Sequence, residues 1–160
     1  MIRPVSTSDA ATICAIYNHY IVNTCISFEE EPISESGMAV RIKEISSSYP
    51  WLVWEEHGEV IGYAYAGKWK SRTAYRYAVE STVYLRHDVA GRGIGRKLYE
   101  QLVIDLRKAG MHCVVGCVAL PNDASQRLHE KLGFKKVGHF DQAGRKFEQW
   151  IDIGYWQLLL

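Results

Sequence analysis

Long apolar runs are missing from this sequence. The most apolar stretch, Val114–Leu120, is far shorter than the roughly 20 residues that a helix needs to cross a bilayer. The amino terminus, Met-Ile-Arg-Pro-Val-Ser, is not followed by the apolar segment of a secretory leader. We therefore expect a cytoplasmic protein with no membrane partner.

An excess of one charge is missing as well. The chain has 19 Lys and Arg against 18 Asp and Glu, which gives a formal net charge of +1. A nearly neutral chain has no overall field to attract nucleic acid. We expect no nucleic-acid partner, and any basic site must be local.

Metal-ligand patterns are also absent. The four cysteines, Cys14, Cys25, Cys113 and Cys117, include no CxxC pair, and the six histidines have no metal-like spacing. Cys113 and Cys117 lie four apart in an expected strand, so they share one face. We expect reduced, buried thiols, with neither a metal site nor a disulfide.

The 160 residues, 48% of them hydrophobic, suit one domain over residues 1–160. Apolar periodicity and turn residues predict an α/β layered domain with a mixed sheet. Strands are expected at Ile2–Val5, Trp51–Glu55, Glu59–Ala66, Tyr75–Leu85, Cys113–Leu120, Phe134–Phe140 and Lys146–Leu158, the last two joined by a turn at Ala143-Gly144. Helices are expected from Ser8 or Asp9, after Ser34, over Gly93–Lys108, and over Asp123–Leu132 with Ala124, Leu128 and Leu132 inward.

A glycine-rich turn, Gly91-Arg92-Gly93-Ile94-Gly95, lies between the long strand and the clearest helix. Unpaired amides at a helix N-terminus favour anions such as a pyrophosphate, and Arg92, Arg96 and Lys97 add positive charge. The spacing is neither that of a Walker A loop nor that of a dinucleotide fingerprint. By itself the pattern fits a simple turn as well as a phosphate site.

The chain resembles the GCN5-related N-acetyltransferase (GNAT) superfamily in four segments: residues 83–85, the turn at 91–95, Asn122-Asp123-Ala124-Ser125, and the run Leu128-His129-Glu130-Lys131-Leu132-Gly133-Phe134. Within the superfamily it is similar to the phosphinothricin and methionine sulfoximine acetyltransferases. Pro50-Trp51-Leu52-Val53, Glu80-Ser81-Thr82-Val83-Tyr84 and Asp152-Ile153-Gly154-Tyr155-Trp156-Gln157 carry that narrower likeness, which extends from Ile2 to Leu158.

The resemblance implies a mixed, mostly antiparallel sheet of about seven strands with four helices. It implies acetyl-CoA as acetyl donor, held in a gap between the fourth and fifth strands. The implied cofactor-binding residues are Val83, Tyr84, Leu85, Gly91, Arg92, Gly93, Ile94, Gly95, Arg96, Asn122 and Ser125. Ala90 departs from the family, many of whose members carry Gln or Arg there, although the backbone amide remains.

The resemblance also implies two catalytic residues. Glu80 is expected to deprotonate the amine, directly or through water, because an amine attacks a thioester only when it is neutral. His129 stands where most of the superfamily has Tyr, and acid, base and orienting roles all stay open for it. Without the resemblance, both would be read as ordinary polar residues of a strand and a helix.

An anionic amino-acid-like substrate is implied, since a carboxylate or phosphinate needs cations and hydrogen-bond donors. The substrate-binding residues by this likeness are Phe28, Lys70, Ser71, Arg72, Tyr75, Thr82 and Ile153, although a solvated loop is the plainer interpretation of the Lys70–Arg72 segment. Acetylation of an ordinary amino acid or a peptide terminus is an alternative, as is a non-catalytic acyl-CoA-binding module. The family likeness also implies a homodimer.

Overall fold

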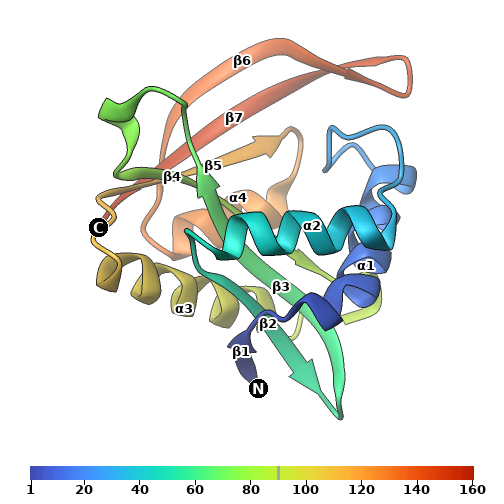
Figure 1. The fold of residues 1–160 in the computed structure, drawn as a ribbon. Coiled ribbons are helices and arrows are strands. Elements are labelled where there is room, and N and C mark those ends of the chain that lie inside the picture. The colour runs from blue at the N-terminus through green and yellow to red at the C-terminus, as the bar shows by residue number, and fades with distance from the viewer. Residues whose placement is uncertain (90) are drawn as a thin grey trace.

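The computed structural model describes residues 1–89 and 91–160, so Ala90 lies outside the described residues. One seven-stranded sheet has the order β1-β2-β3-β4-β5-β7-β6, and only the β4–β5 pairing is parallel (Figure 1). Its strands are β1 Ile2–Pro4, β2 Trp51–Glu56, β3 Glu59–Lys68, β4 Ala78–Leu85, β5 Cys113–Ala119, β6 Lys135–Lys146 and β7 Gln149–Leu159. The helices are α1 Ala10–Asn23, α2 Glu35–Ser46, α3 Ile94–Lys108 and α4 Asp123–Lys131. The predicted fold class is confirmed.

Helices cover both faces of the sheet. Helices α1 and α2 pack on one face, where Ile13, Ile16, Met38 and Ile42 are buried against alternate residues of β2 and β3. Helix α3 packs on the other face with a stripe of buried residues every three or four positions, beginning at Ile94. No helix of the described residues is both long and apolar enough to cross a membrane.

Two predicted details of the secondary structure are wrong. Strand β4 begins at Ala78, where pairing with Cys113 begins, and Thr73–Tyr75 forms a 3₁₀ turn instead. The final hairpin turns at Phe147-Glu148, whose φ angles are 50° and 61°, and not at Ala143-Gly144.

Two burial predictions are wrong as well. On α4 it is His129 that is buried, while Ala124 is exposed. Cys14 is buried as expected, but Cys117 is exposed. Cys117 on β5 and His129 on α4 both line one cavity. The spacing of apolar residues in the sequence does not predict this cavity.

Strands β4 and β5 pair only from Ala78↔Cys113 to Ser81↔Gly116. Beyond these residues β4 continues against β3 as far as Leu85, and β5 continues against β7 as far as Ala119. One side of each strand end is therefore left without a strand partner in the described chain. The divergence opens the middle of the sheet, and this opening positions the site.

Candidate active site

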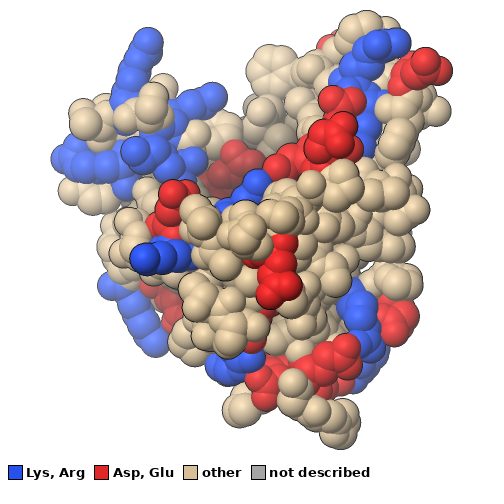
Figure 2. Space-filling model, turned by 45° about the vertical axis from the view of Figure 1, so that its right-hand side comes forward, with Lys and Arg blue, Asp and Glu red and all other residues tan. Residues whose placement is uncertain are grey.

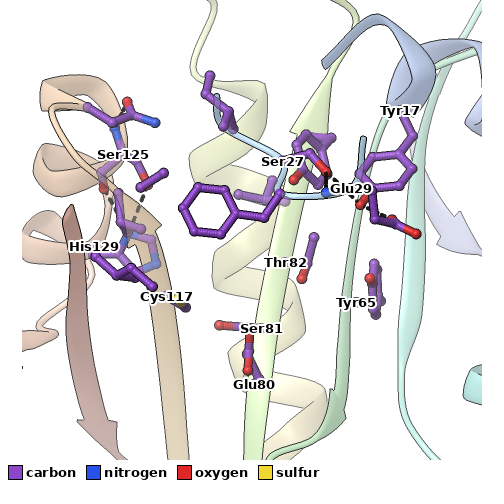
Figure 3. A pocket seen from close by; sticks show the side chains of 18 of the residues that line it. Tyr17, Ser27, Glu29, Tyr65, Glu80, Ser81, Thr82, Cys117, Ser125 and His129 are labelled. Atoms are coloured by element: carbon purple, nitrogen blue, oxygen red, sulfur yellow. Dashed lines mark hydrogen bonds between the residues drawn. The ribbon is translucent and has the colours of Figure 1, made fainter. Parts of the chain in front are cut away.

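A cavity of about 550 Å³ lies where β4 and β5 diverge. In Figure 3, Ser125, His129 and Cys117 lie on one side, Tyr17, Glu29 and Tyr65 lie on the other, and Glu80, Ser81 and Thr82 follow β4 between them. The residues predicted from the sequence that line it are Phe28, Glu80, Thr82, Val83, Tyr84, Asn122, Ser125, His129 and Ile153.

Glu80 lies on β4 one residue before the last pair with β5, so its half-buried carboxylate lies at the base of the cavity. Burial raises its pKa above the ordinary value of 4.5, and the positive charge of Lys70 opposes this shift in part. A carboxylate whose neutral form is favoured in this way is a stronger base than an exposed glutamate. It therefore accepts a proton more readily than an exposed glutamate does.

His129 is 4% exposed and both of its ring nitrogens have partners. Nδ1 lies 2.7 Å from the carbonyl oxygen of Ser125, which only accepts, so Nδ1 carries the proton. Nε2 lies 3.1 Å from the Tyr99 hydroxyl and accepts from it. Burial lowers the pKa of the imidazole, and the hydrogen bond to Ser125 opposes this shift. Burial thus favours the neutral ring, and the Ser125 carbonyl favours the tautomer with the proton on Nδ1.

A buried hydrogen-bonded chain continues from His129 to the strands. The Tyr99 hydroxyl is hydrogen-bonded to Ser81 Oγ, which in turn lies 3.3 Å from the Val115 carbonyl oxygen. Gly116 makes room for the imidazole, because a Cβ at this position would lie 2.3 Å from His129 Nε2. The chain thus ties the imidazole to both diverging strands.

The glycine turn has the conformation that its composition predicts. Gly91 and Gly93 have φ angles of 80° and 75°, which side-chain-bearing residues rarely adopt. Gly93 caps α3 without a side-chain hydrogen bond, and the first-turn amides of any helix lack intrahelical acceptors. Arg92 and Arg96 do not extend freely into solvent, since they pair with Glu56 at 2.9 Å and Glu100 at 2.8 Å.

The predicted cations lie outside the cavity lining. Lys70, Ser71, Arg72 and Tyr75 are exposed on the connection between β3 and β4, and none contributes to the cavity wall. Figure 2 shows Lys and Arg side chains crowded on one lobe beside a hollow that holds acidic side chains. The positive charge of Lys70 nevertheless favours the ionised form of Glu80, so one residue of this segment acts on the base of the cavity.

Sequence reasoning missed the polar wall opposite His129. Arg41 on α2 forms a two-pronged ion pair with Glu29, at 2.8 and 3.0 Å, and the Tyr17 hydroxyl donates to the same carboxylate. The hydrogen bonds from Arg41, together with its charge, lower the pKa of Glu29 and favour the ionised carboxylate. Ser27, Tyr65, Ser81, Tyr99 and Cys117 also line the cavity. The acidic run Glu29–Glu31 was visible in the sequence, but its partner 12 residues away was not marked by any motif.

Comparison with known proteins gives a consistent result. The profile of the "Acetyltransferase (GNAT) domain" family matches residues 2–154. A phosphinothricin N-acetyltransferase of Streptomyces viridochromogenes is 43% identical over 156 residues, covering 98% of this chain and 85% of the relative. An L-methionine sulfoximine/L-methionine sulfone acetyltransferase of Salmonella typhimurium is 38% identical, covering 99% and 94%.

A solved structure has the same fold with a ligand bound. The phosphinothricin acetyltransferase of Sinorhizobium meliloti in complex with acetyl-CoA matches with a TM-score of 0.96 and 35% identity, covering 100% of this chain and 88% of that one. The likeness therefore extends over the diverging strands, the glycine turn and the cavity.

Proposed function

Since this chain belongs to the GNAT family of acetyltransferases, we propose that it transfers the acetyl group of acetyl-CoA to the α-amino group of a small anionic amino acid of the phosphinothricin or methionine sulfoximine and sulfone type. Residues 1–160 act as one N-acetyltransferase domain in this proposal. The observation that carries it is the position of Glu80, a desolvated carboxylate at the base of the cavity that the diverging strands open.

The described residues fit acetyl-CoA. On the side of β4 that has no strand partner beyond Ser81, the stretch Val83–Leu85 would offer backbone groups to an amide-bearing arm, beside the Tyr20 hydroxyl that donates to the Leu85 carbonyl oxygen at 2.6 Å. The turn over 91–96 offers amides at a helix N-terminus to a diphosphate. Asn122 Oδ1 accepts from the Ser125 amide at 3.1 Å, which orients the Asn122 side-chain amide at the cavity wall. When bound, acetyl-CoA supplies an acetyl group activated as a thioester.

Glu80 acts as the base in this proposal. An α-amine is mostly protonated at pH 7 and must lose a proton before it attacks. The raised pKa of the Glu80 carboxyl narrows the gap to the ammonium, so the proton moves to a carboxylate oxygen directly or through one water. The positive charge of Lys70 favours the ionised carboxylate, the form that accepts a proton.

His129 acts as an orienting group. Its Nδ1–H is held by the Ser125 carbonyl and its Nε2 by the Tyr99 hydroxyl, so no N–H of the ring is left for a departing thiolate. Its role is to hold Ser125 and the start of α4 against β5, through the close contact with Gly116. Of the three roles that the sequence leaves open, the hydrogen bonds favour this one.

The proposed amine site combines residues of the cavity wall with exposed cationic residues of the β3–β4 connection. Phe28, Thr82 and Ile153 line the cavity beside Glu80 and give the substrate side chain a bounded space. In this proposal the exposed residues Lys70, Ser71, Arg72 and Tyr75 face the mouth of the cavity, where they would draw in and hold an anionic group. N-acetylation removes the ammonium charge of such a compound, so the activity would confer resistance to herbicides of the phosphinothricin type.

A homodimer and a cytoplasmic location belong to the same proposal. Val137, Phe140, Phe147 and Trp150 expose more than half of their surface along the β6–β7 hairpin, which suits a contact between two copies. Four free thiols suit a reducing compartment in which acetyl-CoA is available. Light scattering after size-exclusion chromatography should give twice the mass of the 18.3 kDa chain, and the monomer mass would refute the dimer.

The test of the proposed function is release of free thiol from acetyl-CoA with a panel of amines. The panel contains phosphinothricin, methionine sulfoximine, methionine sulfone, unmodified amino acids and a short peptide. We expect thiol release with at least one of the first three, and a larger kcat/KM there than with the peptide. Activity confined to ordinary amino acids or the peptide would refute the proposed substrate class and assign one of these alternatives. Binding of acetyl-CoA without any transfer would favour a non-catalytic module.

A further inference from the structure

Two segments far apart in the sequence meet beside the cavity. Lys146, near the tip of the β6–β7 hairpin, donates from Nζ to the carbonyl oxygen of Ser27 at 2.6 Å. Ser27 belongs to the connection between α1 and α2, toward which the hairpin extends in Figure 1. This contact joins the hairpin to the segment that supplies Phe28 to the cavity wall.

A lysine side chain is seldom as buried as that of Lys146. It is only 2% exposed. Burial lowers the pKa of the ammonium, and the charges of Cys25, Glu30 and Glu29 oppose this shift. A buried cation is unfavourable unless hydrogen bonds and charges compensate it, and an apolar residue of similar size often serves stability as well. What an apolar residue cannot supply is the hydrogen bond to the Ser27 carbonyl.

A second contact lies two residues earlier on the same strand. A Cβ at Gly144 would lie 2.3 Å from the Phe28 ring, so the strand backbone and the ring are already in close contact. Ser27 itself is 3% exposed, and its Oγ lies 2.9 Å from the Tyr17 hydroxyl. The hairpin therefore fixes two consecutive residues, the Ser27 carbonyl and the Phe28 ring, while Tyr17 fixes Ser27 from α1.

We propose that Lys146 is a positioning residue for the amine site: its hydrogen bond to Ser27 holds Phe28 in the cavity wall and so sets the affinity for the amine substrate. This inference rests on the proposed function, because it takes the space beside Phe28 as the amine site. Lys146 does not line the cavity, and it acts through Phe28. The donor arm, held by β4 and the glycine turn, is not affected by it.

The test compares K146M with wild type by steady-state kinetics, using the amine that gives thiol release in the panel. Met keeps the apolar stem and removes the donor. Loss of a hydrogen bond from a charged group predicts that the KM for the amine rises about tenfold or more, while the KM for acetyl-CoA stays within about twofold. Lys135→Met, an exposed change on the same strand, is the matched control and should leave both constants unchanged.

A double-mutant cycle decides whether Lys146 works through Phe28. In the Phe28→Ala background, K146M should change the KM for the amine by less than about twofold. An equal change in both backgrounds, or an unchanged KM in K146M, would overturn the proposal. Should K146M fail to fold, Gly144→Ala tests the other contact of the hairpin with Phe28: the added methyl displaces the ring and should raise the KM for the amine, and an unchanged KM would overturn the proposal.

Hydrogen exchange separates this inference from the choice of substrate. Amides of residues 24–33 should exchange faster in K146M than in Lys135→Met, whatever amine the enzyme uses. Unchanged exchange would refute the positioning role of Lys146 even if the substrate class is right. Faster exchange in a protein that acetylates none of the amines would support the hydrogen bond of Lys146 as a restraint on Ser27 and refute the proposed function.

Discussion

Gly116→Ala tests the arrangement around His129 most sharply. The added Cβ would lie 2.3 Å from His129 Nε2 and 2.6 Å from Cδ2, distances that real Cβ atoms do not show. The backbone of Gly116 cannot withdraw, because it pairs with Ser81 on one side and with Trp156 on the other. The imidazole must therefore move, and its hydrogen bond with Tyr99 breaks.

The magnitude follows from these two effects. Overpacking a buried site costs about 1–3 kcal/mol, and loss of the buried hydrogen bond adds about 1 kcal/mol. We expect the free energy of unfolding to fall by about 2–4 kcal/mol. For a chain of this size the melting temperature should fall by about 5–15 °C. Acetyl transfer should fall as well, because Ser125 and the start of α4 lose their support.

The assay is thermal unfolding by circular dichroism, with Gly67→Ala as the matched control. Gly67 also lies in a strand of this sheet, but a Cβ there meets nothing within 4 Å. Alanine at such a position should be neutral or stabilise by up to about 1 kcal/mol, because glycine loses more backbone entropy on folding. Equal melting temperatures for the two variants would refute the placement of His129 against Gly116.

Three further changes test single groups of the site. Glu80→Gln should lower kcat/KM by about 10²–10⁴-fold without weakening acetyl-CoA binding. Because burial raises the pKa of Glu80, ionisation of its carboxyl destabilises the folded state as pH rises through that pKa. The Gln variant should therefore have a higher melting temperature than wild type at pH 7 but not below pH 4.5. A lower melting temperature of the variant at pH 7 would contradict this. Tyr99→Phe leaves His129 Nε2 buried without a donor and should lower the melting temperature by about 3–10 °C, as scanning calorimetry can show; an unchanged transition would mean that water replaces the hydroxyl. Arg41→Met should raise the KM for the amine more than the KM for acetyl-CoA, because it leaves the Glu29 carboxylate in the cavity wall without its ion-pair partner. Equal changes in both constants would mean that the Arg41–Glu29 pair stabilises the fold and does not shape the amine site.

Periodicity and turn chemistry were enough to predict most of the architecture. The stripe on α3, the hairpin at His57-Gly58 and the order of strands and helices all follow from local sequence. The last turn was misplaced because Gly144 looks like a turn glycine. In the structure it is a place of close approach to Phe28, a contact between segments more than a hundred residues apart.

The site could be predicted only as far as its motifs reach. Motif positions marked Glu80, Asn122 and His129, which line the cavity, and the glycine turn before α3, which does not. The resemblance to the family could not show that both nitrogens of His129 are bound, since Tyr99 and Ser81 meet it only after β4, α3 and α4 pack together. The Arg41–Glu29 pair and Lys146 were missed for the same reason, because each depends on a tertiary contact between residues with ordinary local sequence.

Calorimetric titration of the purified protein with acetyl-CoA tests the central claim most directly. The account predicts saturable binding of one molecule per chain, carried by the opening between β4 and β5 and by the glycine turn. An absence of binding heat at every temperature tried, together with an unchanged melting temperature at saturating acetyl-CoA, would contradict the assignment of this cavity to acetyl transfer.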